Sequence, residues 1–274
     1  EASSQLLISD NLISGISEEG IFFEGVSSGG VSDVVENEIV DNTIGTNLQS
    51  TIPIGNGGNG IKLERSSGNA IFYNLISGNG FQGSTGAGSG ILLNFSLSTG
   101  NIIGGNLIGL ARNGIDAIGN AGNGISLNAA SSNTIGDVFG DGDFNYISGN
   151  LGAGITLIQS SNTNTVVGNI IGEGTDGMTT VPNGNSGINI VGSSNNKIGG
   201  TNSIESNLIA NNSSDGIRIE EFLGTNSLGN EILGNSIYSN VEQGIDLGSD
   251  GVTSNDDMDP DTGVHNLQNY PELV

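Results

Sequence analysis

Four carboxylates in the last third of the chain are spaced so that they could perform acid–base chemistry. Asp215, Glu220 and Glu221 stand close together, and Asp246 follows later. Hydrolysis of a glycosidic bond needs two such groups within roughly 5–10 Å of each other. Arg218 and Asp246, however, hold the same position in consecutive repeats, 28 residues apart. We therefore interpret Arg218 and Asp246 as a cross-strand ion pair rather than as part of a catalytic site.

Cations are scarce, and this limits the chemistry that can be expected on acidic sugars. The chain has 274 residues with 29 acidic and 5 basic side chains, which gives a net charge of −24. Enzymes that remove a proton next to a sugar carboxylate need a positive group to stabilise it. Lys62 and Arg218 share one outward position but lie five repeats apart, roughly 24 Å at the spacing of β-strands. They cannot meet on one sugar, so the sequence predicts no catalytic residues.

An acidic stretch near the C-terminus is the strongest candidate for a metal site. Its leading members alternate before a glycine, as Asp257-x-Asp259-x-Asp261-x-Gly263, and Asp250 and Asp256 precede them. Hard oxygen donors at a spacing of two on an irregular loop suit Ca²⁺, which takes six to eight oxygen ligands. The sequence thus predicts a calcium site made by Asp250, Asp256, Asp257, Asp259 and Asp261. A weaker second cluster is formed by Asp137, Asp141 and Asp143.

The composition excludes several other classes of protein. A net charge of −24 repels nucleic acid and anionic lipid, so neither is an expected partner. No run of about 18 apolar residues exists, so no membrane insertion is expected. The absence of cysteine excludes disulfides, thiolate metal sites and a cysteine nucleophile. The single histidine, His265, lies beyond the repeats, which argues against a Ser/His/Asp triad.

A short repeat positions all of these residues. The pattern Gly-Ile-x-Leu/Ile/Phe recurs along the chain at intervals of 28 to 40 residues. Its glycines are Gly20, Gly60, Gly90, Gly124, Gly154, Gly187, Gly216 and Gly244. Two Asn-x-Ile/Val segments lie between most successive glycines, for example at Asn69 and Asn74. Alternate repeats are the most alike, so the larger period is about 63 residues. Each repeat therefore holds three short β segments closed by Gly, Asn or Ser.

Three short strands per repeat, each with one β-branched residue pointing inward, are typical of a parallel β-helix. We predict one all-β domain: a right-handed parallel β-helix of about eight to nine coils with three parallel sheets. The coils should occupy residues 1–254, and residues 255–274 should form an acidic closing loop and terminal strand of the same domain. Lys62, Ser126, Asn189 and Arg218 should point outward. The inward residues should include Ile61, Leu63, Ile91, Leu93, Ile125, Leu127, Ile155, Leu157, Ile188, Ile190, Ile217 and Ile219. Corner asparagines should bond to those of the next coil.

Segments such as Asn145-Tyr-Ile-Ser-Gly-Asn150 and Ser194-Asn-Asn-Lys-Ile-Gly-Gly200 resemble the right-handed parallel β-helix repeats of large bacterial surface proteins. The tail from Gly244 to Asp257, with Leu267-Gln-Asn-Tyr-Pro271, resembles the segment that closes such arrays. The resemblance covers nearly the whole chain and implies the fold and its handedness. It leaves activity open, because the same coil carries polysaccharide-active enzymes and plain spacers.

Two functions remain on the sequence alone. The favoured hypothesis is an extracellular structural or adhesive module at a cell surface, without catalytic activity. The alternative is a carbohydrate-binding or carbohydrate-cleaving β-helix, with a groove beside the long turns at residues 46–59, 110–123 and 173–186. The first apolar segment, Leu6-Leu-Ile8, has no helix before it to cover the strand edges. The expected partners are therefore further coils of the same chain or head-to-tail copies of it, with surface polysaccharide as a further partner.

Overall fold

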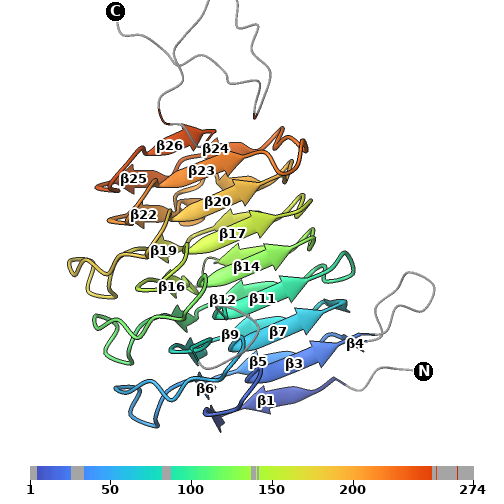
Figure 1. The fold of residues 1–274 in the computed structure, drawn as a ribbon, viewed down its shortest axis with the longest axis vertical. Coiled ribbons are helices and arrows are strands. Elements are labelled where there is room, and N and C mark those ends of the chain that lie inside the picture. The colour runs from blue at the N-terminus through green and yellow to red at the C-terminus, as the bar shows by residue number, and fades with distance from the viewer. Residues whose placement is uncertain are drawn as a thin grey trace, which may run out of the picture.

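The protein is a right-handed parallel β-helix, as the computed structural model shows (Figure 1). The structure describes residues 5–25, 34–81, 88–136, 140, 142–248, 251 and 264. The strands form three sheets of eight strands each, and every neighbouring pair within a sheet is parallel and comes from successive coils. Seven full turns therefore separate the first rung from the last, so the predicted eight to nine coils is slightly too high.

The strand bounds follow the three stations of the repeat. Sheet A contains β1 (Leu7–Ser9), β5 (Glu38–Val40), β9 (Ala70–Phe72), β12 (Ile102–Gly104), β15 (Thr134–Gly136), β18 (Thr165–Val167), β21 (Lys197–Gly199) and β24 (Glu231–Leu233). Sheet B contains β2 (Leu12–Ile13), β6 (Thr43–Ile44), β10 (Leu75–Ile76), β13 (Leu107–Ile108), β16 (Tyr146–Ile147), β19 (Ile170–Ile171), β22 (Leu208–Ala210) and β25 (Ser236–Tyr238). Sheet C contains β3 (Ile21–Glu24), β7 (Ile61–Glu64), β11 (Ile91–Asn94), β14 (Ile125–Asn128), β17 (Ile155–Ile158), β20 (Ile188–Val191), β23 (Ile217–Glu220) and β26 (Ile245–Leu247).

Two small elements complete the description. The short strands β4 (Val34–Val35) and β8 (Ser66–Ser67) pair beside the main sheets, and one 3-10 turn, η1, spans Ser203–Glu205. Within the described residues, no helix is long and apolar enough to cross a membrane.

The core is a stack of aliphatic side chains, one column for each inward position. All twelve predicted inward residues of sheet C, from Ile61 to Ile219, have no exposed surface. Glycine precedes the first isoleucine of each strand of this sheet because the coil is tightest there. A Cβ on Gly60 would lie 2.5 Å from the Ile76 side chain and 2.7 Å from the carbonyl of Gly90. The recurring Gly-Ile pair is therefore a packing requirement of the coil.

Asparagine ladders run along three corners of the helix, as predicted. In each ladder the Nδ2 group of one asparagine donates to the Oδ1 atom of the asparagine one coil on, at 2.8–3.3 Å. The ladders are Asn37, Asn69, Asn101, Asn133, Asn164, Asn196 and Asn230 before sheet A; Asn11, Asn42, Asn74, Asn106, Asn145, Asn169, Asn207 and Asn235 between sheets A and B; and Asn56, Asn79, Asn120, Asn150, Asn183, Asn212 and Asn240 after sheet B. Most of these asparagine side chains are buried. The ladders therefore give their amide groups the hydrogen-bond partners that buried polar groups need.

Three long turns between sheets B and C protrude from one edge of the molecule, coloured blue, green and yellow in Figure 1. Each is closed near its base by an antiparallel bridge: Thr46 with Pro53, Leu110 with Ala117, and Glu173 with Thr180. They belong to alternate coils, which explains why the sequence repeats best at about 63 residues.

Candidate functional site

The outer face of sheet C brings together the charged residues that the sequence singled out. The second residue of each strand points outward, and parallel pairing aligns these residues in one row. The row is Phe22, Lys62, Leu92, Ser126, Thr156, Asn189, Arg218 and Asp246. Charged groups therefore stand at the two ends of the face, and uncharged groups lie between them.

Arg218 is the centre of a cluster of four carboxylates. Its guanidinium lies 2.6 Å from the Asp215 carboxylate, 3.0 Å from Glu242, 3.7 Å from Glu220 and 3.9 Å from Asp246. Burial disfavours the charged guanidinium, but the hydrogen bond to Asp215 and the nearby carboxylates outweigh this, so the pKa of Arg218 lies above its ordinary value. With every carboxylate ionised, this Arg218 cluster carries an excess of negative charge.

The four carboxylates differ in accessibility, and this divides their roles. The Asp215 side chain is fully buried and also accepts the backbone N–H of Gln243 at 2.9 Å, so it anchors the arginine. The Asp246 side chain is nearly as buried. Glu220 is 30% exposed and Glu242 is 50% exposed, which makes these two the carboxylates that a bound ligand can reach.

A neutral polar track crosses the middle of the same face. Asn94 on β11, Asn128 on β14, Thr156 on β17 and Asn189 on β20 each have a side-chain oxygen that is buried and has no hydrogen-bond partner. An unmade hydrogen bond of this kind costs about 1–3 kcal/mol. Asn94 and Asn128 pair at the fourth position of their strands, and Thr156 and Asn189 pair at the second, so the four oxygens form two adjacent pairs on four consecutive strands. This polar track of acceptors suits a ligand rich in hydroxyl donors.

Lys62 stands at the other end of the face, on β7. Its ammonium lies 2.9 Å from Glu64 and 3.5 Å from Glu19, and it sits 4.9 Å from the centre of the Phe22 ring. Burial acts to raise the pKa of Glu64, but hydrogen bonds from Lys62 and Asn94 outweigh it, so that pKa lies below its ordinary value. Glu64, the fourth residue of β7, is therefore the main partner of Lys62.

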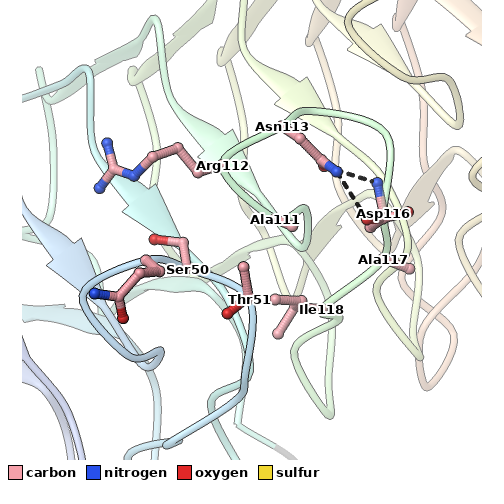
Figure 2. A pocket seen from close by; sticks show the side chains of 9 residues that line it. Ser50, Thr51, Ala111, Arg112, Asn113, Asp116, Ala117 and Ile118 are labelled. Atoms are coloured by element: carbon pink, nitrogen blue, oxygen red, sulfur yellow. Dashed lines mark hydrogen bonds between the residues drawn. The ribbon is translucent and has the colours of Figure 1, made fainter.

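Pockets flank the face on both sides. One of about 480 Å³ lies at the carboxyl ends of β17, β20 and β23, where it is lined by Phe222, Leu223 and Gln159 among others. Another of about 410 Å³ lies between the first two long turns (Figure 2). The groove expected beside the long turns is therefore present between two of them.

The outcome for the sequence-derived candidates is mixed. Asp215, Glu220 and Asp246 come together, and the predicted pairing of Arg218 with Asp246 is confirmed. Glu221 is exposed and forms no ion pair in the described part of the chain. Sequence reasoning missed Glu242, although it follows Ser214 by the same 28 residues that separate Arg218 from Asp246 and accepts a hydrogen bond from Ser214 at 2.8 Å.

The predicted calcium ligands Asp250, Asp256, Asp257, Asp259 and Asp261 lie outside the described residues, as do Asp137, Asp141 and His265. The closing segment 255–274 lies outside them too, except for Val264. Asp143 is described, and its carboxylate accepts a hydrogen bond from the Tyr73 hydroxyl at 2.7 Å. In the described ranges, no group of three or more acidic or histidine side chains is arranged to hold a metal ion.

Comparison with solved structures places the fold beside polysaccharide-modifying enzymes. The A-module of the mannuronan C-5 epimerase AlgE4 from Azotobacter vinelandii is 17% identical with a TM-score of 0.57, over 91% of this chain and 57% of the epimerase chain. A mutant of the periplasmic alginate epimerase AlgG is 18% identical with a TM-score of 0.52, over 85% of this chain and 49% of that one. This chain thus spans roughly half the length of each. No family model and no curated protein matches the sequence.

These findings correct the functional expectation. The favoured hypothesis of a structural or adhesive module without catalytic activity is contradicted, because the two similar structures named above are a mannuronan C-5 epimerase and an alginate epimerase, which favour the alternative. The physical premise of that hypothesis also fails. It reduced Arg218 and Asp246 to a simple ion pair, yet the Arg218 cluster gathers four carboxylates and a guanidinium from two coils.

Proposed function

We propose that this protein is a polysaccharide-active β-helix, in which a saccharide chain lies along the outer face of sheet C and reacts at the Arg218 cluster. The observation that carries the proposal is the polar track of four unsatisfied oxygens, which lie in two adjacent pairs on Asn94 and Asn128 and on Thr156 and Asn189. Polar groups buried without partners are rare in folded proteins, and a functional ligand is one explanation for a row of them.

The spacing of the row supports a polymer rather than a small ligand. Successive coils are about 4.8 Å apart, which is close to the length of one pyranose ring, and the polar track crosses four strands, or three such steps. Each sugar can therefore offer a hydroxyl to one coil. The inward residues of the same strands are packed aliphatic side chains, so the face is rigid and preorganised for an extended chain.

The reaction that fits the cluster is cleavage of a glycosidic bond by Glu220 and Glu242. Both carboxylates lie within 4 Å of one guanidinium, so the oxygens that face it are no farther apart than the upper limit of roughly 10 Å that glycosidases use. One protonated carboxyl would give its proton to the glycosidic oxygen as the bond to the anomeric carbon breaks. The other would activate water or attack that carbon. Arg218, held by Asp215, would position both.

A second candidate is epimerisation of a uronate polysaccharide, which the two epimerase structures favour. In that reaction a carboxylate of the cluster would remove the proton at C5, and a proton would return on the opposite face of the sugar ring. Arg218 would stabilise the charge that develops on the sugar carboxylate. The negative charge of the cluster opposes the approach of a uronate, so we place this reaction second.

Incubation with neutral glucans and mannans and with alginate separates these functions. New reducing ends report hydrolysis, and the proton NMR spectrum of the recovered alginate reports a changed configuration at C5. The expected result is new reducing ends from a neutral polysaccharide. Binding of no polysaccharide at all, or turnover that E220Q and E242Q both leave unchanged, would contradict the proposal.

The polysaccharide proposal implies a location outside the cytoplasm, in the periplasm or beyond the cell, and the epimerase AlgG is itself periplasmic.

Calcium bound by Asp250, Asp256, Asp257, Asp259 and Asp261 remains a proposal, supported by the spacing of these residues. A chelator should then lower the melting temperature, and added calcium should restore it. An unchanged melting temperature in both cases would leave only a solvated acidic loop.

A further inference from the structure

A second site lies between the first two long turns, away from the outer face of sheet C. The pocket there has a volume of about 410 Å³, and its lining includes Gln49, Ser50, Thr51, Arg112, Asn113 and Asp116 (Figure 2). The two turns belong to alternate coils and touch through one backbone hydrogen bond, from Arg112 N–H to the Ser50 carbonyl at 3.4 Å. Each turn is closed by its own bridge, so the walls are held independently.

Arg112 is unusual in this protein because its charge is not neutralised. Lys62, Arg65, Lys197 and Arg218 all have carboxylate partners, whereas Arg112 forms no ion pair in the described part of the chain. One of its N–H groups donates to the Thr43 hydroxyl at 2.8 Å, which fixes the side chain. The remaining donors form no hydrogen bond with any described residue. A fixed guanidinium with free donors is suited to a carboxylate.

The floor of the pocket holds a second unsatisfied group. Ser50 is fully buried, and its hydroxyl has no hydrogen-bond partner in the described structure. In Figure 2 the Arg112 side chain extends over the side of the pocket where Ser50 lies. A hydroxyl without a hydrogen-bond partner beside a guanidinium without an ion-pair partner points to a ligand with several polar atoms.

Asp116 explains why the ligand must be more than a simple anion. Figure 2 places Asn113 and Asp116 together on the opposite side from the guanidinium, and the Asn113 amide donates to the Asp116 carboxylate at 2.7 Å. The Asn113 carbonyl accepts the backbone N–H groups of residues 115 and 116, so this side is rigid. An exposed carboxylate repels an anion but accepts hydrogen bonds from hydroxyls. The ligand must therefore carry its negative charge at one end and hydroxyl groups at the other.

We propose that this pocket binds a uronate residue of a saccharide, with its carboxylate on Arg112 and its ring hydroxyls toward Asp116. The choice of a sugar over other hydroxy acids rests on the proposed polysaccharide function. Alignment of the long turns puts Leu48 and Thr175 at the position of Arg112. The other two turns carry no charge there, so the site belongs to the first pair of turns alone.

The test measures binding of a uronate trisaccharide and of its carboxyl-reduced neutral counterpart by isothermal titration calorimetry. R112T installs the residue of the third turn, and T175L, at the equivalent position of that turn, is the matched control. We expect R112T to weaken binding of the acidic trisaccharide at least tenfold and R112K to recover part of it. T175L should bind like the wild type, and the neutral trisaccharide should bind weakly to every variant.

Equal affinity of R112T and the wild type for the acidic trisaccharide would overturn the site, provided that both melt at the same temperature. Equal affinity for the acidic and the neutral trisaccharide would do the same. Acetate that binds as tightly as the trisaccharide would overturn the sugar and leave a simple anion site. The Asn128→Ala variant separates this proposal from the previous one: it should weaken binding of a long neutral polysaccharide on sheet C and leave binding of the acidic trisaccharide unchanged.

Discussion

The two ends of sheet C carry almost the same sequence but very different surroundings. Gly60-Ile-Lys-Leu-Glu64 and Gly216-Ile-Arg-Ile-Glu220 place a cation and a carboxylate at the same two outward positions. Lys62 has two carboxylates within 4 Å and the ring of Phe22 beside it. Arg218 has four carboxylates within 4 Å, two of them from the next coil.

This difference shows that the shared motif alone does not determine the surroundings of its cation. The side chains of the adjacent coil determine them. At the Lys62 end the preceding coil supplies Phe22 and Glu19, so the cation is covered by a ring and has two carboxylate partners. At the Arg218 end the following coil supplies Glu242 and Asp246, so negative charge exceeds positive. The first end is therefore a natural control for the second.

The largest contrast should appear in activity. E220Q and E242Q should each lower turnover by about 10²–10⁴-fold, because each removes a group that transfers a proton or attacks the sugar. E64Q, at the position of Glu220 in the Lys62 motif, should leave turnover unchanged. Initial rates of reducing-end release measure all three. Equal rates for E64Q and E220Q would remove the distinction between the two ends.

Stability should differ next. R218M should lower the free energy of unfolding by about 3 kcal/mol, because it leaves the fully buried Asp215 carboxylate without its cation. K62M should cost no more than about 1 kcal/mol, since Glu19 and Glu64 can turn toward water. Denaturant unfolding followed by circular dichroism gives both values, and similar losses in the two variants would contradict the contrast.

The polar track between the two ends should show a smaller effect, on binding rather than on stability. Asn128→Ala and Asn189→Ala should each weaken polysaccharide binding by about fivefold, roughly 1 kcal/mol for a lost hydrogen bond. Neither should lower the melting temperature much, because each removes an acceptor that has no partner in the free protein. The exposed Asn202, beside η1, offers N202A as a control. A large loss of stability with unchanged binding would make these oxygens structural.

The smallest effect concerns how the free energy of unfolding falls at acid pH because of the Lys62–Glu64 pair. The pKa of Glu64 is lowered from 4.5, so its pairing stabilises the fold fully above that pH and is lost as the pH falls through the lower folded-state pKa. Between pH 5 and 3 the wild type should therefore lose about 0.5 kcal/mol more than E64Q. Unfolding midpoints across this range measure the difference, and parallel curves would show that the pair contributes nothing.

The fold was predictable because the β-helix repeats one local pattern. Inward Ile and Leu, corner asparagines and the register of Arg218 with Asp246 all follow from counting residues between repeats. The site was less predictable because residues in turns complete it. Strand alternation says where Glu220 points, but no periodicity says that Glu242, in a turn, reaches back to Ser214 and Arg218. A groove beside the long turns was expected, but the place of Arg112 in it was not, because two turns 64 residues apart approach each other only in three dimensions.

The asparagine ladders give the molecule a direction. Along each ladder the side-chain Oδ1 accepts from the asparagine of the preceding coil, and the side-chain Nδ2 donates to the asparagine of the following coil. One end of each hydrogen-bonded chain is therefore an oxygen and the other an N–H, and the two ends of the rod are electrostatic opposites. Any coil added to either end, from this chain or another copy, continues the ladders only if it runs the same way. Two rods that met by like ends would face acceptor with acceptor or donor with donor, so neither arrangement would continue the ladders.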